Sequence, residues 1–335
     1  METILEVKHL KTHFFTRLGV VKAVDDVSFV LTKGECLCLV GESGCGKTTA
    51  ALSILRLVDS PPGRIVAGEI LYREEDLLRV SAAALRKIRG NRIAMIFQDP
   101  QSSLNPVFTV GDQIAEPLRL HLRLRKGPAL ERSQLLMEQV GIPRADERCR
   151  DYPHQLSGGM KQRVMIALAL SCQPEIIIAD EPTSALDTTI KAQILDILVS
   201  LKQNRELSLL FITHDFGTVA GIADRVAVMY SGKIVESGTK TDILDHPIHP
   251  YTIGLLNCLP RIGGVRRRLT PIPGAIPSLV EPPPGCPFQP RCSSCLPICH
   301  RETPHEVTVS SGHTVACHLC SEPASKDVTH GEKTD

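Results

Sequence analysis

Short apolar runs bounded by turn residues dominate the first third of the chain. Five of them have the length and composition of strands: residues 4–7, 21–31, 36–40, 69–72 and 92–97. The run CLCLV at residues 36–40 has no polar position, which is typical of a strand covered on both faces. The turn KGE at residues 33–35 separates it from the strand before it.

A helical period replaces this pattern from residue 110 to about residue 170, where Ile114, Leu118 and Leu122 recur every fourth position. Strands are expected again at residues 175–179, 207–213 and 225–230, and a long amphipathic helix at residues 188–204. This strand–helix–strand order predicts an α/β fold with a mostly parallel, buried sheet and a helical block inserted into it.

Composition narrows the class of protein. The chain has 335 residues, 42% of them hydrophobic, which suits two domains or one large domain with an appendage. A net charge of +1 argues against nucleic acid bound by bulk electrostatics. No apolar run approaches a membrane span, and the N-terminus METILE is not a signal peptide. We therefore expect a cytosolic protein that would reach a membrane only through a partner.

The motif GESGCGKT follows the apolar run at residues 36–40 and precedes a helical stretch at residues 49–55. Glycines allow successive backbone N–H groups to face phosphate oxygens, Lys47 adds a positive charge, and the Thr48 hydroxyl is suited to Mg²⁺. The alternative is a glycine-rich turn that binds nothing. The residues expected at a nucleoside triphosphate are Gly41, Glu42, Ser43, Gly44, Cys45, Gly46, Lys47, Thr48 and Thr49.

Two acids end the apolar run at residues 176–179. The tip of a strand beside a phosphate loop is where an Asp that organises Mg²⁺ belongs, which indicates Asp180. Glu181 follows it and would orient or deprotonate the attacking water. The alternative is that both acids only cap the turn before Pro182.

A second anion site is indicated by the sequence LSGGMKQR at residues 156–163, because a Ser and two glycines open an apolar helix. Its members are Ser157, Gly158, Gly159 and Met160. A chain with two phosphate-binding helix starts is able to sandwich ATP head-to-tail with another copy.

Together these motifs resemble the nucleotide-binding subunit of ABC transporters, whose signature is LSGGQ, with Met160 at the last position here. Gln98 resembles the Q-loop glutamine and His214 the switch histidine that contacts the γ-phosphate. The family also stacks adenine on an aromatic residue upstream of the loop, for which Phe15 is preferred over Phe14, with core packing as the alternative. The resemblance covers residues 4 to about 260.

The resemblance implies a P-loop NTPase: a RecA-like core with a mostly parallel sheet, N-terminal antiparallel strands and an ABC helical subdomain at about residues 100–170. Lys47, Gln98, Glu181 and His214 would then be the catalytic residues of Mg-ATP hydrolysis. We expect a nucleotide-binding domain at residues 1–258 and a small, irregular, Cys-rich C-terminal extension at residues 259–321. Residues 322–335 are polar and are expected to be disordered.

A subfamily resemblance rests on further segments, among them QDPQSSLNP at residues 98–106 and HPYT at residues 249–252. They resemble the dipeptide/oligopeptide importers, a branch that also takes nickel complexes. This implies a second, related ATPase subunit, two membrane-spanning permease subunits and an extracytoplasmic peptide-binding protein. The chain would work at the cytoplasmic face of the bacterial inner membrane. A nickel or other small-solute importer is the alternative, followed by a soluble ABC ATPase without a transport role.

Six of the 12 cysteines fall between residues 286 and 320, and a local cluster in a cytosolic chain indicates metal ligation before disulfides. Spacing alone offers CxxC pairs at residues 292–295 and 317–320, which are typical of a zinc ribbon. The family resemblance instead implies a [4Fe–4S] cluster on Cys286, Cys292, Cys299 and Cys317. Cys295 and Cys320 leave the choice of ligands open, and a chain without a metal is the third reading.

Overall fold

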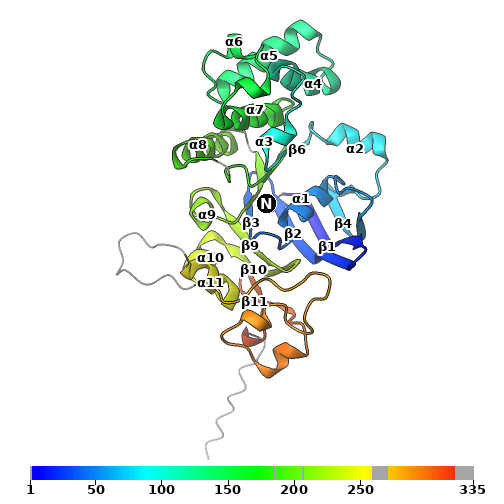
Figure 1. The fold of residues 1–335 in the computed structure, drawn as a ribbon, viewed down its shortest axis with the longest axis vertical. Helices are drawn as coiled ribbons and strands as arrows, with labels where there is room; N and C mark the ends of the chain where they lie inside the picture. Colours follow the sequence, from blue (N-terminus) through cyan, green and yellow to red (C-terminus); the bar gives the residue numbers. More distant parts are fainter. Residues whose placement is uncertain (1, 185, 206, 259–270, 321–335) are drawn as a thin grey trace, which may run out of the picture.

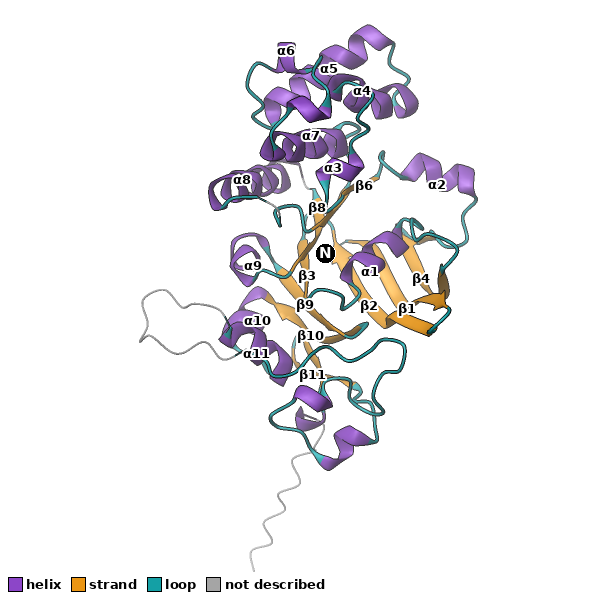
Figure 2. Ribbon diagram, in the orientation of Figure 1, coloured by secondary structure: helices purple, strands orange, loops and turns teal. Residues whose placement is uncertain are grey.

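The structure is a computed structural model that describes residues 2–184, 186–205, 207–258 and 271–320. Two sheets form its centre, a lobe of helices lies at one end, and the C-terminal segment lies at the other (Figure 1). The strands lie at the centre of the molecule, and helices pack around the larger sheet (Figure 2). The expected disorder of residues 322–335 falls outside the described residues.

The larger sheet has eight strands in the order β11-β12-β10-β9-β3-β8-β7-β6. Its central strands are parallel and fully apolar or nearly so, which confirms the prediction of a mostly parallel, buried sheet. The strands are β3 (Cys36–Val40), β6 (Ile93–Ile96), β7 (Ile176–Asp180), β8 (Ser208–Thr213), β9 (Arg225–Tyr230), β10 (Lys233–Thr239), β11 (Glu306–Ser310) and β12 (His313–Ala316).

The second sheet is antiparallel, with the order β2-β1-β4-β5. Its members are β1 (Thr3–Thr16), β2 (Gly19–Thr32), β4 (Gly63–Tyr72) and β5 (Glu75–Asp76). β1 runs well past the apolar run at residues 4–7 that indicated it, because it forms a long hairpin with β2, whose bounds lie within two residues of the predicted 21–31. Polar residues such as Lys8, His9 and Lys11 hide the rest of β1 in the sequence.

The helices include the three helical regions that the sequence pattern indicated, at residues 49–55, 110–170 and 188–204. They are α1 (Lys47–Ile54), α2 (Ala82–Ile88), α3 (Pro100–Ser103), α4 (Val110–His121), α5 (Lys126–Gln139), α6 (Ala145–Arg148), α7 (Gly158–Leu170), α8 (Thr188–Arg205), α9 (Phe216–Ile222), α10 (Lys240–Asp245) and α11 (Pro250–Asn257). The sequence pattern did not indicate α2, α3 and α9 to α11. α4 to α7 make up the helical lobe at the top of Figure 1. Thr109 starts α4 as an N-cap, since its side chain accepts a hydrogen bond from the Asp112 N–H.

The C-terminal segment is more regular than its prolines suggest, because it adds two strands to the larger sheet. β12 pairs antiparallel with β10, with Glu236 opposite Val315. The buried Glu236 carboxylate lies 2.9 Å from His313 Nε2 and accepts a 2.7 Å hydrogen bond from the Ile248 N–H. A buried carboxylate with several partners holds its neighbours in one arrangement, so this contact ties the segment to the cassette.

Aromatic packing makes the second junction between this segment and the cassette. The ring of Phe288 lies with its centroid 5.2 Å from that of Tyr230 and 5.4 Å from that of Tyr251. Tyr230 ends β9 and Tyr251 belongs to α11, and both are fully buried. Large rings in edge or tilted contact contribute to the core of the fold, so the segment is packed onto the body of the molecule.

The loop between β3 and α1 is held close to neighbouring backbone. Gly46 caps α1 with a φ of 108°, and a Cβ there would lie 2.0 Å from the Ala23 carbonyl oxygen on β2. Gly44 also has a positive φ, 81°, but a Cβ there would have nothing within 4 Å. The loop therefore needs glycine at Gly46 for space and at Gly44 for backbone conformation only.

This difference predicts unequal costs for two alanine substitutions. We expect Gly46→Ala to lower the free energy of unfolding by about 3 kcal/mol or more, since β2 or the loop must move. Gly44→Ala, the matched control, costs about 1 kcal/mol for the left-handed conformation alone. Urea unfolding of the two variants measures both values, and equal losses would contradict the close approach to Ala23.

Candidate functional site

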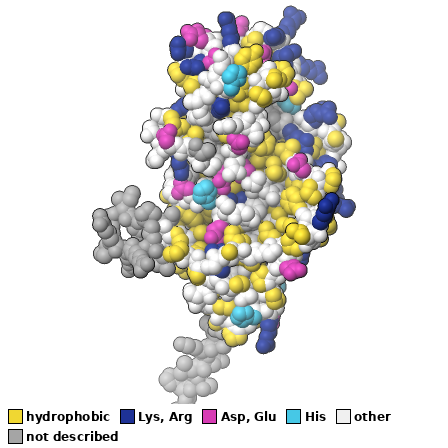
Figure 3. Space-filling model, viewed as in Figure 1, with side chains coloured by type: hydrophobic (Ala, Val, Ile, Leu, Met, Phe, Trp, Pro, Cys, Tyr) yellow, Lys and Arg dark blue, Asp and Glu magenta, His cyan; other side chains and the backbone are white. Residues whose placement is uncertain are grey.

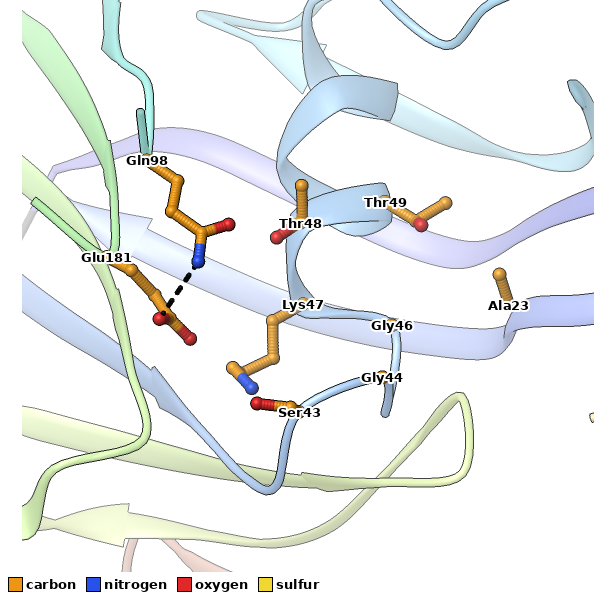
Figure 4. Close-up of a pocket in the computed structure, with 9 residues that line it drawn as sticks. All are labelled: Ala23, Ser43, Gly44, Gly46, Lys47, Thr48, Thr49, Gln98 and Glu181. Atoms are coloured by element: carbon orange, nitrogen blue, oxygen red, sulfur yellow. Dashed lines mark hydrogen bonds between the residues drawn. The ribbon is translucent and has the colours of Figure 1, made fainter. Parts of the chain in front are cut away.

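One polar pocket lies where β3 ends and α1 begins. It is lined by Ala23, Ser43, Gly44, Gly46, Lys47, Thr48, Thr49, Gln98 and Glu181. Figure 4 shows the loop and the start of α1 on one side, with Gln98 and Glu181 on the other. The carboxyl ends of parallel strands meet at one edge of a sheet, and the order β3-β8-β7-β6 brings these residues together there.

Lys47 is the buried cation of this pocket. Its ammonium donates hydrogen bonds to the Gly41 carbonyl at 2.8 Å and to the Glu42 carbonyl at 3.0 Å. The side chain thus folds back over the loop, between backbone carbonyls and the open side of the pocket. From this position the Lys47 ammonium is able to replace its hydrogen bonds to these carbonyls by hydrogen bonds to phosphate oxygens.

Thr48 connects the loop to β7. Its hydroxyl donates a 3.1 Å hydrogen bond to Asp180, the last residue of that strand, which is buried. Burial raises the pKa of the Asp180 carboxyl, and the Thr48 hydrogen bond works against this effect. A hydroxyl and a buried carboxylate in contact are oxygen donors of the kind that Mg²⁺ prefers.

Glu181 stands between two polar side chains from neighbouring strands. Its carboxylate lies 3.3 Å from Gln98 Nε2, after β6, and 3.1 Å from His214 Nδ1, after β8. Glu181 has a φ of 45°, which is uncommon for a residue other than glycine. This conformation turns the side chain off the end of β7 and toward the pocket.

The second anion motif lies elsewhere in the single chain. Ser157 is the N-cap of α7, and its hydroxyl accepts a 3.3 Å hydrogen bond from the Met160 N–H. α7 belongs to the helical lobe, and neither Ser157 nor its neighbours Gly158, Gly159 and Met160 line the pocket with Lys47. Phe15 is half exposed on β1 and does not line this pocket either.

The predicted [4Fe–4S] site is wrong, and so is its zinc alternative. Cys286, Cys292, Cys299 and Cys317 do line one small cavity, but no group of three or more His, Cys, Asp or Glu side chains in the described residues is arranged to hold a metal ion. Burial raises the pKa of Cys286 and of Cys317 to about 11, as expected for thiols packed among apolar side chains. Cys286 and Cys299 instead pack in the core cluster with Phe288, as small hydrophobic side chains.

Two residues to which the sequence assigned no role at the site touch the loop. Tyr251 of α11 accepts a hydrogen bond from the Glu42 N–H at 2.9 Å, and Arg291 of the C-terminal segment pairs with the Glu42 carboxylate at 2.7 Å. Both lie more than 200 positions from Glu42. Local patterns carry no signal of contacts over such separations.

No helix in the described part of the chain is both long and apolar enough to cross a bilayer.

Comparison with known proteins agrees with the geometry of the site. Residues 24–184 match the family model described as ABC transporter. Residues 235–299 match a second model, described as oligopeptide/dipeptide transporter, C-terminal region.

Two curated relatives come from Bacillus subtilis (strain 168). The dipeptide transport ATP-binding protein DppD is 48% identical over 335 residues, which is 100% of both chains. The oligopeptide transport ATP-binding protein AppD is 48% identical over 97% of this chain and 99% of its own.

A solved structure of the ATP-binding cassette MJ0796, bound to ADP and Pi as a dimer, has a TM-score of 0.64 and 26% identity. The match covers 70% of this chain and 98% of that one. The cassette fold, the full-length relatives and the pocket at the end of β3 agree, and the chain belongs to the ABC transporter family as one of its ATP-hydrolysing subunits.

Proposed function

We propose that the chain binds and hydrolyses Mg-ATP to drive the import of dipeptides and oligopeptides. The observation that carries the proposal is the meeting of Lys47, the Thr48–Asp180 pair and Glu181 at one edge of the sheet. A cation, a pair of oxygen donors for Mg²⁺ and a carboxylate for water are the parts that phosphoryl transfer to water requires. The full-length relatives that transport dipeptides and oligopeptides support the choice of solute.

Each residue has a role in this proposal. The loop amides and Lys47 hold the β- and γ-phosphates, and Thr48 with Asp180 holds Mg²⁺. Glu181 would orient or deprotonate the attacking water, and Gln98 and His214, which both contact its carboxylate, would hold it in place. His214 would also contact the γ-phosphate. Phe15, half exposed on β1, offers a face on which adenine stacks.

A second subunit completes the ATP site. Ser157, Gly158 and Gly159 form a helix start in the helical lobe, away from the chain's own loop, and the first two of them are exposed. Backbone N–H groups at such a start bind anions, so they would face the γ-phosphate held by a partner cassette. We infer a related second ATPase subunit as that partner, with two membrane-spanning permease subunits and an extracytoplasmic peptide-binding protein. Residues 1–258 form the ATPase domain of this assembly and residues 259–321 its family-specific extension.

The surface of the helical lobe fits a membrane-protein partner. Exposed apolar side chains follow α3 and line the outside of α4, namely Val107, Phe108, Leu120 and Leu122. Figure 3 shows hydrophobic side chains beside Lys and Arg side chains on this end of the molecule. Such a mixed surface suits the cytoplasmic loops of permease subunits, so the chain works at the cytoplasmic face of the cell membrane.

Glu181→Gln tests the proposed chemistry. The amide keeps the size of the side chain but is unable to take a proton, so we expect ATP hydrolysis to fall by about 100-fold or more while ATP binding is kept. Glu175→Gln is the control, since Glu175 lies at the opposite end of β7 and contacts Tyr72 and Arg73. Single-turnover hydrolysis and ATP titration separate the two effects. Hydrolysis at the wild-type rate would remove Glu181 from the reaction.

Gly158→Ala tests the shared site. A Cβ at this position has nothing within 4 Å in the single chain, and alanine stabilises a helix by about 0.5–1 kcal/mol relative to glycine. We therefore expect a fold at least as stable as the wild type, with ATP-dependent pairing of subunits and turnover both lost. Gly127→Ala in α5, also with open space around its Cβ, is the matched control. Normal turnover in Gly158→Ala would contradict a role in a partner's ATP site.

The solute is tested with the assembled complex. We expect dipeptides or oligopeptides, presented by the binding protein, to stimulate ATP hydrolysis several-fold in liposomes, because solute loading favours closure of the two ATPase subunits. Nickel chelates form the comparison series. Stimulation by nickel chelates alone would assign the chain to the nickel-importing branch instead.

A further inference from the structure

Glu42, the second residue of the phosphate loop, is held from three directions. Its N–H donates to the Tyr251 hydroxyl at 2.9 Å, and its carbonyl accepts from the Lys47 ammonium at 3.0 Å. Its carboxylate accepts hydrogen bonds from both terminal nitrogens of the Arg291 guanidinium, at 2.7 Å and 3.0 Å. A single loop residue therefore links the candidate catalytic lysine, α11 and the C-terminal segment.

Contacts other than the one with Glu42 also hold the Arg291 side chain in place. Its side chain is 4% exposed, its Nε donates to the Pro273 carbonyl at 3.0 Å, and its guanidinium lies 5.8 Å from the centre of the Tyr230 ring. A planar guanidinium held this way presents a rigid two-pronged donor to a carboxylate. The geometry is that of a specific bidentate pair rather than of a loose surface contact.

The charge of Glu42 needs such a partner. It is the one acidic residue of the motif at residues 41–48, and its side chain is 29% exposed at the loop that the proposed function assigns to a triphosphate. A carboxylate at an anion site repels the ligand and so weakens its binding unless the carboxylate is paired. Pairing with Arg291 neutralises the carboxylate and directs it toward the C-terminal segment.

We propose that Arg291 is a positioning residue of the ATP site, acting through Glu42. It cancels the charge of the loop's only carboxylate and keeps the first turn of the loop in the shape that receives phosphates. This inference rests on the proposed function, that the loop binds Mg-ATP. In consequence the extension, although it contributes no reacting group, sets the affinity of the cassette for nucleotide.

The test is the dissociation constant for Mg-ATP of the purified full-length chain and its variants. Arg291→Met keeps the apolar stem and removes the charge, and we expect binding about tenfold weaker from the unpaired carboxylate. The double variant Glu42→Gln/Arg291→Met lacks both charges, so we expect it to recover most of that loss. Arg291→Lys keeps the charge without the two-pronged contact and is expected in between. Arg301→Met, an exposed arginine of the same segment, is the matched control.

Two further readings distinguish charge from packing. The loss in Arg291→Met should be larger for ATP than for ADP and should shrink at high salt, since it is repulsion between charges. Thermal unfolding of each variant reports whether the segment remains docked. Wild-type affinity in Arg291→Met overturns the inference, and so does a double variant that binds as weakly as Arg291→Met alone. A wild-type chain that fails to bind Mg-ATP would instead refute the proposed function.

Discussion

Parallel pairing of β3 with β8, of β8 with β7 and of β7 with β6 sets where each polar group of the site lies. The segments that follow β3, β6 and β7 line one pocket at this edge, and His214, which follows β8, reaches it through its contact with Glu181. The apolar strands hold this edge in place, since a slip of one residue would turn each strand's buried side chains over. The chemistry thus depends on hydrophobic contacts well below the pocket.

Much of this arrangement could be predicted from the sequence. The loop motif and the apolar runs are local signals, and the run at residues 36–40 is β3 to the residue. Asp180, Glu181 and His214 could be placed because each lies one or two residues after such a run. Their proximity then follows from parallel strand order, which the helix between two strands already indicates.

The C-terminal segment shows where this reasoning fails. Cysteine spacing suggested a metal, yet spacing does not report how the side chains are arranged in space, and no group of three or more His, Cys, Asp or Glu side chains in the described residues is placed to hold a metal ion. The C-terminal segment is held to the cassette by contacts between residues that are far apart in the sequence. They are Glu236 with His313, three aromatic rings, and Arg291 with Glu42. No sequence motif indicates these contacts, because the two partners of each contact come together only in the folded chain. The length of β1 escaped prediction because polar residues such as Lys8, His9 and Lys11 interrupt its apolar pattern.

The pairing of β12 with β10 has a consequence for how the chain is made. The strands are neighbours in the sheet, but residues 240–312 are translated between them. Until β12 has been synthesised, the backbone N–H and C=O groups along that side of β10 lack the strand with which they pair in the folded protein. An open strand edge is a template for pairing with other chains, so synthesis passes through an interval of exposure to misassembly. The last described strand closes this interval at about the same time as Arg291 becomes available to the loop.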